Sequence, residues 1–132
     1  MSTEKMTNNR VLLMDDDPMV LDIAIRMLDH LGFYSSTAKN GEEAIKLYKQ
    51  EFEKGQPFNI VILDLTIKGG MGGEETVKKL LEIDPSVIAL VSSGNTNGLT
   101  ISNLKQIGFK GIVEKPYNVE ELKEKLNYTI EN

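Results

Sequence analysis

Four apolar residues lead directly into three aspartates and a proline in the stretch Val11-Leu12-Leu13-Met14-Asp15-Asp16-Asp17-Pro18. A short, continuously apolar run of this kind is typical of a strand buried on both faces of a parallel sheet. Similar runs occupy residues 60–63 and 87–91, and a shorter one occupies residues 111–113. Residues 33–38 are more polar and alternate, as an edge strand would. The sequence therefore predicts five strands.

Between the predicted strands, apolar residues recur at helical spacing and would cover the faces of the sheet. The first such stripe comprises Val20, Ile23, Ala24, Met27, Leu28 and Leu31, and the second comprises Ala44, Ile45, Tyr48 and Phe52. Further helices are expected at residues 74–83, 97–107 and 119–130. Asn40 with Glu43, and Asn118 with Glu121, have the spacing of helix N-caps. Five alternations of strand and helix predict an α/β, doubly wound fold, with helices on both faces of a parallel sheet.

The composition limits the classes of function. A chain of 132 residues has room for one domain, which we expect at residues 9–132 after a flexible lead at residues 1–8. The absence of cysteine excludes disulfides and thiolates, and a single histidine argues against a zinc site. A net charge of -5 without a basic stripe disfavours direct binding of nucleic acid. No apolar run is long enough to insert in a membrane and the first residues are polar, so a cytoplasmic location is expected.

Polar residues stand at the carboxyl ends of the predicted strands, where doubly wound sheets bind their ligands. They are Asp15, Asp16 and Asp17 after the first strand, Asp64 after the third, Ser92 and Ser93 after the fourth, and Lys115 near the fifth. Carboxylates brought together repel one another, by roughly 4 kcal/mol at 4 Å and an effective dielectric constant near 20. A bound cation would relieve this repulsion, and oxygen ligands without histidine or cysteine suit Mg²⁺.

A carboxylate in such a site can act as a nucleophile toward a phosphoryl group, while a cation and a hydroxyl hold the transferred oxygens. Asp64, Lys115 and Ser92 fit these three roles. Three neighbouring polar residues have simpler interpretations. Asp17 is interpreted as a helix cap before Pro18, Ser93 as a small residue lining the site, and His30 as a surface residue.

Four motifs in order resemble those of the response regulator receiver family of two-component signalling. They are residues 11–18, Leu63-Asp64-Leu65-Thr66-Ile67 with the glycine-rich residues 69–73, Val91-Ser92-Ser93-Gly94, and Glu114-Lys115-Pro116-Tyr117. Each motif alone is weak, but four in order over residues 9–130 are specific. The resemblance implies the strand order 2-1-3-4-5 and a cis peptide bond between Lys115 and Pro116.

The resemblance also implies the roles of the site residues. Asp64 would be the phosphoacceptor, and Mg²⁺ would be bound by Asp15, Asp16, Asp64 and the backbone carbonyl of Thr66. Ser92 and Lys115 would contact phosphoryl oxygens. The phosphodonor would be a histidine kinase or a histidine phosphotransfer domain, and an unidentified downstream protein would recognise the phosphorylated form. Such a chain is a signalling switch, not an enzyme with a separate substrate, although it promotes its own phosphorylation and dephosphorylation. The run Asp64-Leu65-Thr66 with residues 69–73 looks more like the receivers attached to hybrid sensor histidine kinases.

Three positions depart from the pattern. Lys68 stands where many receivers have proline, and Ile112 stands where many have an aromatic residue that rotates as a switch. Thr66, two residues after Asp64, would lie beside the path of an attacking water. Two alternatives stay open. One is a phosphatase-like enzyme with an aspartyl nucleophile, although its usual second acid is replaced by Thr66. The other is a pseudo-receiver that binds partners without being phosphorylated.

Overall fold

The computed structural model describes residues 9–95 and 99–131, in which five strands alternate with five helices. In chain order the elements are β1 (Arg10–Met14), α1 (Pro18–His30), β2 (Tyr34–Ala38), α2 (Gly41–Glu53), β3 (Ile60–Asp64), α3 (Gly73–Ile83), β4 (Ala89–Ser93), α4 (Ile101–Ile107), β5 (Gly111–Glu114) and α5 (Val119–Glu131). All strand pairs are parallel, in the order β2-β1-β3-β4-β5. The predicted fold class and strand order are confirmed, and the more polar strand β2 lies at an edge.

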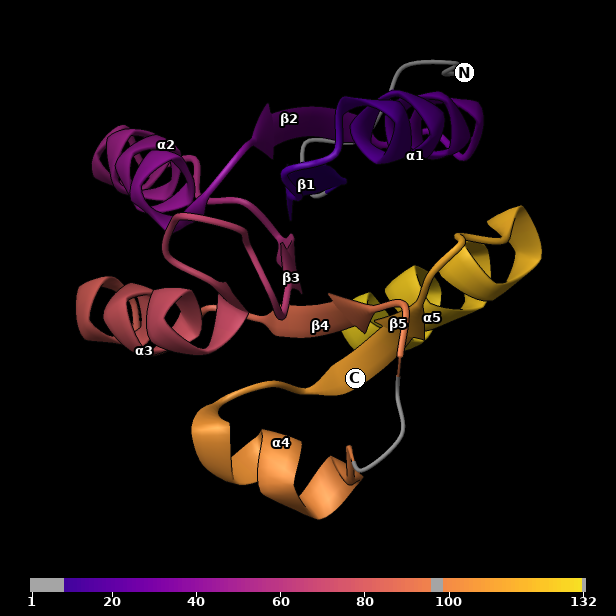
Figure 1. Ribbon diagram of the computed structural model, residues 1–132. Helices are drawn as coiled ribbons and strands as arrows, with labels where there is room; N and C mark the ends of the chain where they lie inside the picture. The colour runs from indigo at the N-terminus through magenta and orange to yellow at the C-terminus, as the bar shows by residue number, and fades with distance from the viewer. Residues whose placement is uncertain (1–8, 96–98, 132) are drawn as a thin grey trace.

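Helices cover both faces of the sheet, α1 and α5 on one and α2, α3 and α4 on the other (Figure 1). Successive strand side chains point to opposite faces. In β1, Val11 and Leu13 pack toward α1 and α5, while Leu12 and Met14 pack toward α2 and α3. All four are fully buried. This double burial explains why β1, β3 and most of β4 are continuously apolar.

The predicted helix starts are confirmed by their capping hydrogen bonds. The Asp17 carboxylate accepts from the backbone N–H of Met19 at 3.0 Å, and Pro18 opens α1. Asn40 accepts from the N–H of Glu43 at 2.9 Å, and Asn118 accepts from the N–H of Glu121 at 3.0 Å. These caps fix where α1, α2 and α5 leave the edge of the sheet. Within the described residues, none of the helices has the length and apolar character needed to cross a membrane.

Several predicted boundaries were wrong. Strand β4 spans Ala89–Ser93, two residues later than expected, so Ser92 and Ser93 end the strand and do not follow it. Its pairing with β3 runs to the register Asp64↔Ser92, which keeps both residues in the ladder. Helix α4 begins at Ile101; of the predicted range 97–107, residues 97 and 98 lie outside the described residues, as does the predicted lead at residues 1–8.

One predicted core residue of α1 does not face the sheet. Ile23 is 47% exposed, whereas α1 buries Leu21, Ala24 and Leu28. A residue two positions after Leu21 lies on nearly the opposite side of a helix with 3.6 residues per turn. Apolar spacing was therefore correct in predicting the helix but wrong about one member of its buried face.

Candidate functional site

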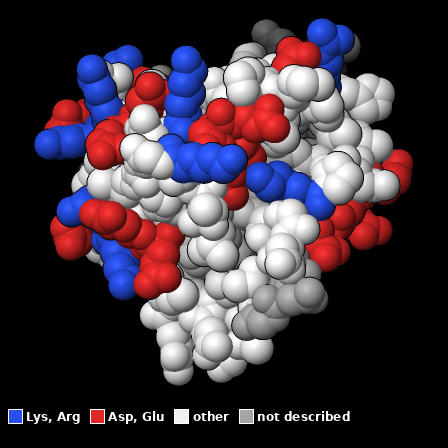
Figure 2. All heavy atoms as spheres, in the orientation of Figure 1, with Lys and Arg blue, Asp and Glu red and all other residues white. Residues whose placement is uncertain are grey.

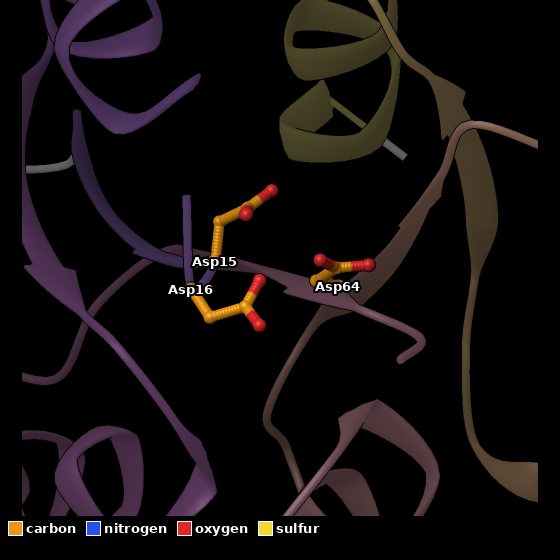
Figure 3. Close-up of side chains that lie close together, drawn as sticks. All are labelled: Asp15, Asp16 and Asp64. Carbon is orange, nitrogen blue, oxygen red and sulfur yellow. The ribbon is translucent and has the colours of Figure 1, made fainter. Parts of the chain in front are cut away.

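Three aspartates meet where β1 and β3 end. Asp15 and Asp16 directly follow β1, and Asp64 is the last residue of its neighbour β3. One carboxylate oxygen from each residue lies within 4.8 Å of the other two, and Figure 3 shows the three groups gathered in one small space. Asp15 and Asp64 are buried, whereas Asp16 is exposed. The predicted convergence of these acids at the carboxyl edge of the sheet is confirmed.

Lys115 brings a positive charge into this acidic site. Its Nζ donates to the carboxylates of Asp15 at 2.9 Å and Asp64 at 3.1 Å. The residue follows β5, and its peptide bond to Pro116 is cis, as expected. Lys115 and Asp15 are 100 positions apart in the chain. Only the order of the strands brings these two residues together.

The site alters the acidity of its charged groups. Burial raises the pKa of Asp64, and the negative charge of Asp15 raises it further, although hydrogen bonds from Lys115 and from the Thr66 backbone oppose the change. Burial disfavours the ammonium of Lys115, but its hydrogen bonds to Asp15 and Asp64 outweigh that effect and raise its pKa. Lys115 therefore stays charged, and the ionised form of Asp64 is less favourable than that of an aspartate exposed to solvent.

Backbone N–H groups orient all three carboxylates. Asp15 accepts from Asp17 at 2.9 Å, Asp64 accepts from Thr66 at 3.3 Å, and Asp16 accepts from Lys68 at 3.1 Å. The Lys68 contact joins the loop after β3 to the loop after β1. The site thus uses the backbone N–H of Lys68, a contact that the sequence does not indicate. Each acid keeps an orientation that points it into the shared space.

The glycine-rich loop lies very close to the backbone that carries Asp64. A Cβ atom at Gly73 would lie 2.7 Å from the carbonyl oxygen of Asp64, and one at Gly72 would lie 2.7 Å from that of Leu65. These contacts are too short for any side chain. The glycines therefore allow α3 to begin directly beside the end of β3.

Ser92 lies beside Asp64, and its hydroxyl is hydrogen-bonded to Tyr117, a residue with no role predicted from the sequence. The Tyr117 Oη donates to the Ser92 Oγ at 2.9 Å, and both residues are buried. Burial raises the pKa of Tyr117 to about 12 despite the opposing hydrogen bond with Ser92. The only signal in the sequence was a hydroxyl-bearing aromatic residue two positions after Lys115. The Ser93 hydroxyl, in contrast, is hydrogen-bonded to the backbone of Asn95, and its place as a small residue lining the site stays a prediction.

The donor set fits a hard divalent cation. Asp15, Asp16 and Asp64 offer three carboxylate oxygens at mutual distances that one ion could span. Mg²⁺ retains water and phosphate oxygens in its other coordination positions, so a site with few protein ligands suits it. Thr66 is exposed two residues after Asp64, and the role of its carbonyl stays a prediction. On the face shown in Figure 2, acidic side chains gather near the centre with basic ones beside them.

The sequence and the fold both resemble known proteins. The model of the response regulator receiver domain matches residues 11–127. A curated relative, the probable C4-dicarboxylate response regulator DctR of Bacillus subtilis, is 33% identical over 122 residues, which cover 89% of this chain and 50% of the relative. The chain spans between 23 and 50% of the length of five such relatives.

Solved structures give the same result for the fold. A chain from the crystal structure of an adenylate cyclase from Rhodopirellula baltica is 30% identical, with a TM-score of 0.80 over 94% of this chain and 88% of that one. A chain of the CheX-CheY-BeF3-Mg²⁺ complex from Borrelia burgdorferi has a TM-score of 0.81, covering 90% and 87% of the two chains. At 23% identity, this second likeness shows the fold alone.

Proposed function

Since the chain belongs to the response regulator receiver family of two-component systems, we propose that Asp64 is the residue on which it accepts a phosphoryl group. The observation that carries the proposal is the surroundings of the Asp64 carboxylate. It is 6% exposed, lies 3.1 Å from the Lys115 ammonium, and shares a space with the carboxylates of Asp15 and Asp16. A buried carboxylate so placed is available as a nucleophile and has a cation beside it.

The proposed transfer forms an acyl phosphate. One oxygen of Asp64 attacks the phosphorus of a phosphohistidine, so that a P–O bond forms as the P–N bond breaks. The imidazole leaves with the electron pair and takes up a proton. Lys115 then pairs with one phosphoryl oxygen, and the Ser92 hydroxyl, from the neighbouring strand, donates to another. As a receiver domain the chain is a signalling switch, and we assign the promotion of its own phosphorylation and dephosphorylation to these residues.

We propose that Mg²⁺ is the cofactor, held by Asp15, Asp16 and Asp64 with the Thr66 carbonyl. When bound, it would supply charge neutralisation for the carboxylates and the phosphoryl oxygens. The backbone N–H groups of Asp17, Thr66 and Lys68 orient the three acids for this task. Lys115 forms ion pairs with both buried acids, Asp15 and Asp64, and is the one cation that does so among residues 9–95 and 99–131.

The phosphodonor would be a histidine kinase or a histidine phosphotransfer domain, and the first turns of α1 offer it an apolar contact surface. Met19 is 74% exposed and Ile23 is 47% exposed, four residues apart on one side of the helix. Helix α1 begins two residues after Asp16, so this surface borders the site. The downstream partner, attachment to a hybrid sensor kinase and a cytoplasmic location stay predictions.

Phosphorylation would act by changing the populations of two conformations. Movement of Ser92 toward the phosphoryl group would carry the loop after β4 with it and alter the surface of α4, β5 and α5. Ile112 is partly buried against the core beneath α4. Isoleucine has no ring that could rotate as the aromatic residue at this position does in many receivers. A switch in this chain would therefore use other residues.

The test is phosphorylation by a small phosphodonor such as acetyl phosphate with Mg²⁺, followed by intact-mass measurement. We expect one added phosphoryl group on the wild type and none on Asp64→Asn. Asp17→Asn is the matched control, because asparagine also caps helices and the substitution keeps the backbone N–H that Asp17 donates to Asp15. Undiminished labelling of Asp64→Asn, or no labelling of the wild type, would contradict the proposal. The phosphatase-like and pseudo-receiver alternatives have no observation in their favour.

A further inference from the structure

Tyr117 and Ser92 share a buried hydrogen bond that the proposed phosphotransfer does not use. The phenol Oη donates to the Ser92 Oγ over 2.9 Å, and the two residues are 8% and 0% exposed. Ser92 is the cross-strand neighbour of Asp64, and Tyr117 comes two residues after Lys115. The bond therefore links the serine of the site to the segment that carries its cation.

Side-chain alternation places this bond on the same face of the sheet as Asp64. Leu90 packs beneath α1 and α5, and Ser92, two residues later in the strand, points the same way. Tyr117 belongs to the same apolar cluster. Ile112 packs against the cluster on the opposite face. The aromatic partner of Ser92 in this chain is therefore Tyr117 and not the residue at position 112.

The hydrogen-bonding capacity of a serine hydroxyl shows what this contact can do. A serine hydroxyl has one proton to donate and two acceptor sites. A phenol is the stronger acid and hence the better donor, so Tyr117 fills one acceptor site and leaves the serine proton free. Within residues 9–95 and 99–131, the Ser92 hydroxyl makes no other hydrogen bond. A phosphoryl oxygen on Asp64 would be the acceptor for that proton.

Packing alone does not account for the Tyr117 hydroxyl. Phenylalanine would fill the same space, and burial of a hydroxyl costs free energy unless it is hydrogen-bonded. Consecutive hydrogen bonds also polarise one another, so donation by Tyr117 makes the Ser92 hydroxyl a better donor. The phenol therefore both fixes and strengthens the contact that Ser92 would make.

We infer that Tyr117 is a positioning residue that orients the Ser92 hydroxyl toward a phosphoryl group on Asp64. This inference rests on the proposed phosphorylation of Asp64. Without the phenol hydroxyl, Ser92 is free to rotate and holds the phosphoryl group less well.

The test measures the affinity for beryllofluoride, a non-covalent mimic of the phosphoryl group, in the presence of Mg²⁺, by ¹⁹F NMR. Tyr117→Phe removes the hydroxyl and keeps the ring. We expect its affinity to fall about fivefold, the effect of one hydrogen bond. Tyr128→Phe, at a tyrosine that is 69% exposed on α5, should leave the affinity unchanged. In a Ser92→Ala background, Tyr117→Phe should have no further effect.

Three results would overturn the inference. The first is an unchanged affinity in Tyr117→Phe, even if its unliganded thermal stability falls. The second is a tighter affinity, which would mean that Tyr117 restrains Ser92 from the phosphoryl group. The third is a fivefold loss that persists without Ser92. If the wild type binds beryllofluoride and Asp64→Asn does not, the proposed function stands whatever Tyr117→Phe shows; if the wild type does not bind it, both proposals fail.

Discussion

Buried carboxylates lie at opposite edges of the sheet, and they are stabilised in different ways. At the carboxyl edge, Asp15 and Asp64 crowd together around one ammonium, that of Lys115. At the other edge, Asp84 follows α3 and accepts hydrogen bonds from the Tyr48 phenol at 2.6 Å and from the Ser86 backbone at 2.9 Å. A cation stabilises Asp15 and Asp64, whereas neutral hydrogen-bond donors stabilise Asp84.

The two environments also affect acidity differently. Burial raises the pKa of Tyr48, and its hydrogen bond to Asp84 and the charge of that residue raise it further, so the phenol stays protonated and keeps donating. The Asp84 carboxylate is thus stabilised by hydrogen bonds from Tyr48 and Ser86. At the carboxyl edge, burial and the charge of Asp15 both oppose the ionisation of Asp64. Burial alone therefore does not distinguish Asp64 from Asp84, whereas the crowding of like charges around a shared cation does.

The largest expected effect comes from Lys115→Met, which leaves Asp15 and Asp64 without their cation. Because the Lys115 side chain is only 19% exposed, we expect the free energy of unfolding to fall by about 2 to 3 kcal/mol. Urea denaturation without Mg²⁺ measures this loss, and added Mg²⁺ should restore part of it. Phosphorylation should also fall by a factor of about 100 or more. Full stability without Mg²⁺ would show that the two acids are not held by Lys115.

A somewhat smaller effect is expected at the other edge from Asp84→Ala. This variant leaves the buried Tyr48 hydroxyl without its acceptor and removes the bond to Ser86, at a cost of about 2 kcal/mol. The same denaturation experiment applies, with Tyr48→Phe as the companion variant. Unlike Lys115→Met, Asp84→Ala should show no rescue by Mg²⁺ and no loss of phosphorylation per folded molecule. A Mg²⁺-dependent rescue would mean that the two edges are coupled.

The smallest expected effect is a gain in stability from Asp64→Asn, of the order of 1 kcal/mol at neutral pH without Mg²⁺. The pKa of Asp64 in the folded state is raised above its ordinary value of 3.8. Its contribution to stability is therefore present below that value and is lost as the pH rises through the folded pKa.

The difference in stability between Asp64→Asn and the wild type should accordingly be small below pH 3.8 and grow as the pH rises through the raised pKa of Asp64. Urea denaturation across this range checks the sign. Asp16→Asn is the control, because Asp16 is an exposed member of the same cluster. If Asp64→Asn is less stable than the wild type at neutral pH, the Asp64 carboxylate stabilises the folded protein, which would contradict the prediction.

Much of the site could be predicted because strand ends are readable in the sequence. The apolar runs before Asp15 and Asp64 locate the ends of β1 and β3, and neighbouring parallel strands end at the same edge of the sheet. Ser92 was expected to follow β4, but it lies within the strand. The error arose because Ser92 and Ser93 are polar, so that the apolar run ends two residues before the strand does. Ile23 was assigned to the core because apolar character alone does not tell which side of a helix is covered.

Other features could not be predicted because they depend on contacts between distant positions. Tyr48 and Asp84 are 36 residues apart, and neither has a neighbour in the sequence that indicates the bond. Tyr117 stood within a recognised motif, yet its contact with Ser92 depends on the register of β4 against β5. The backbone contact from Lys68 to Asp16 likewise spans 52 positions.

The alternation of strands and helices, the caps that open α1, α2 and α5, and the edge at which the acids gather could all be predicted from the amino-acid sequence. These depend on the periodicity and local chemistry of short segments. Three contacts depend on the tertiary structure: the bridge from Lys115 to Asp15 and Asp64, the hydrogen bond from Tyr117 to Ser92, and the hydrogen bond from Tyr48 to Asp84. Hydrogen bonds form over about 3 Å, and that distance between remote residues is set by how strands and helices pack.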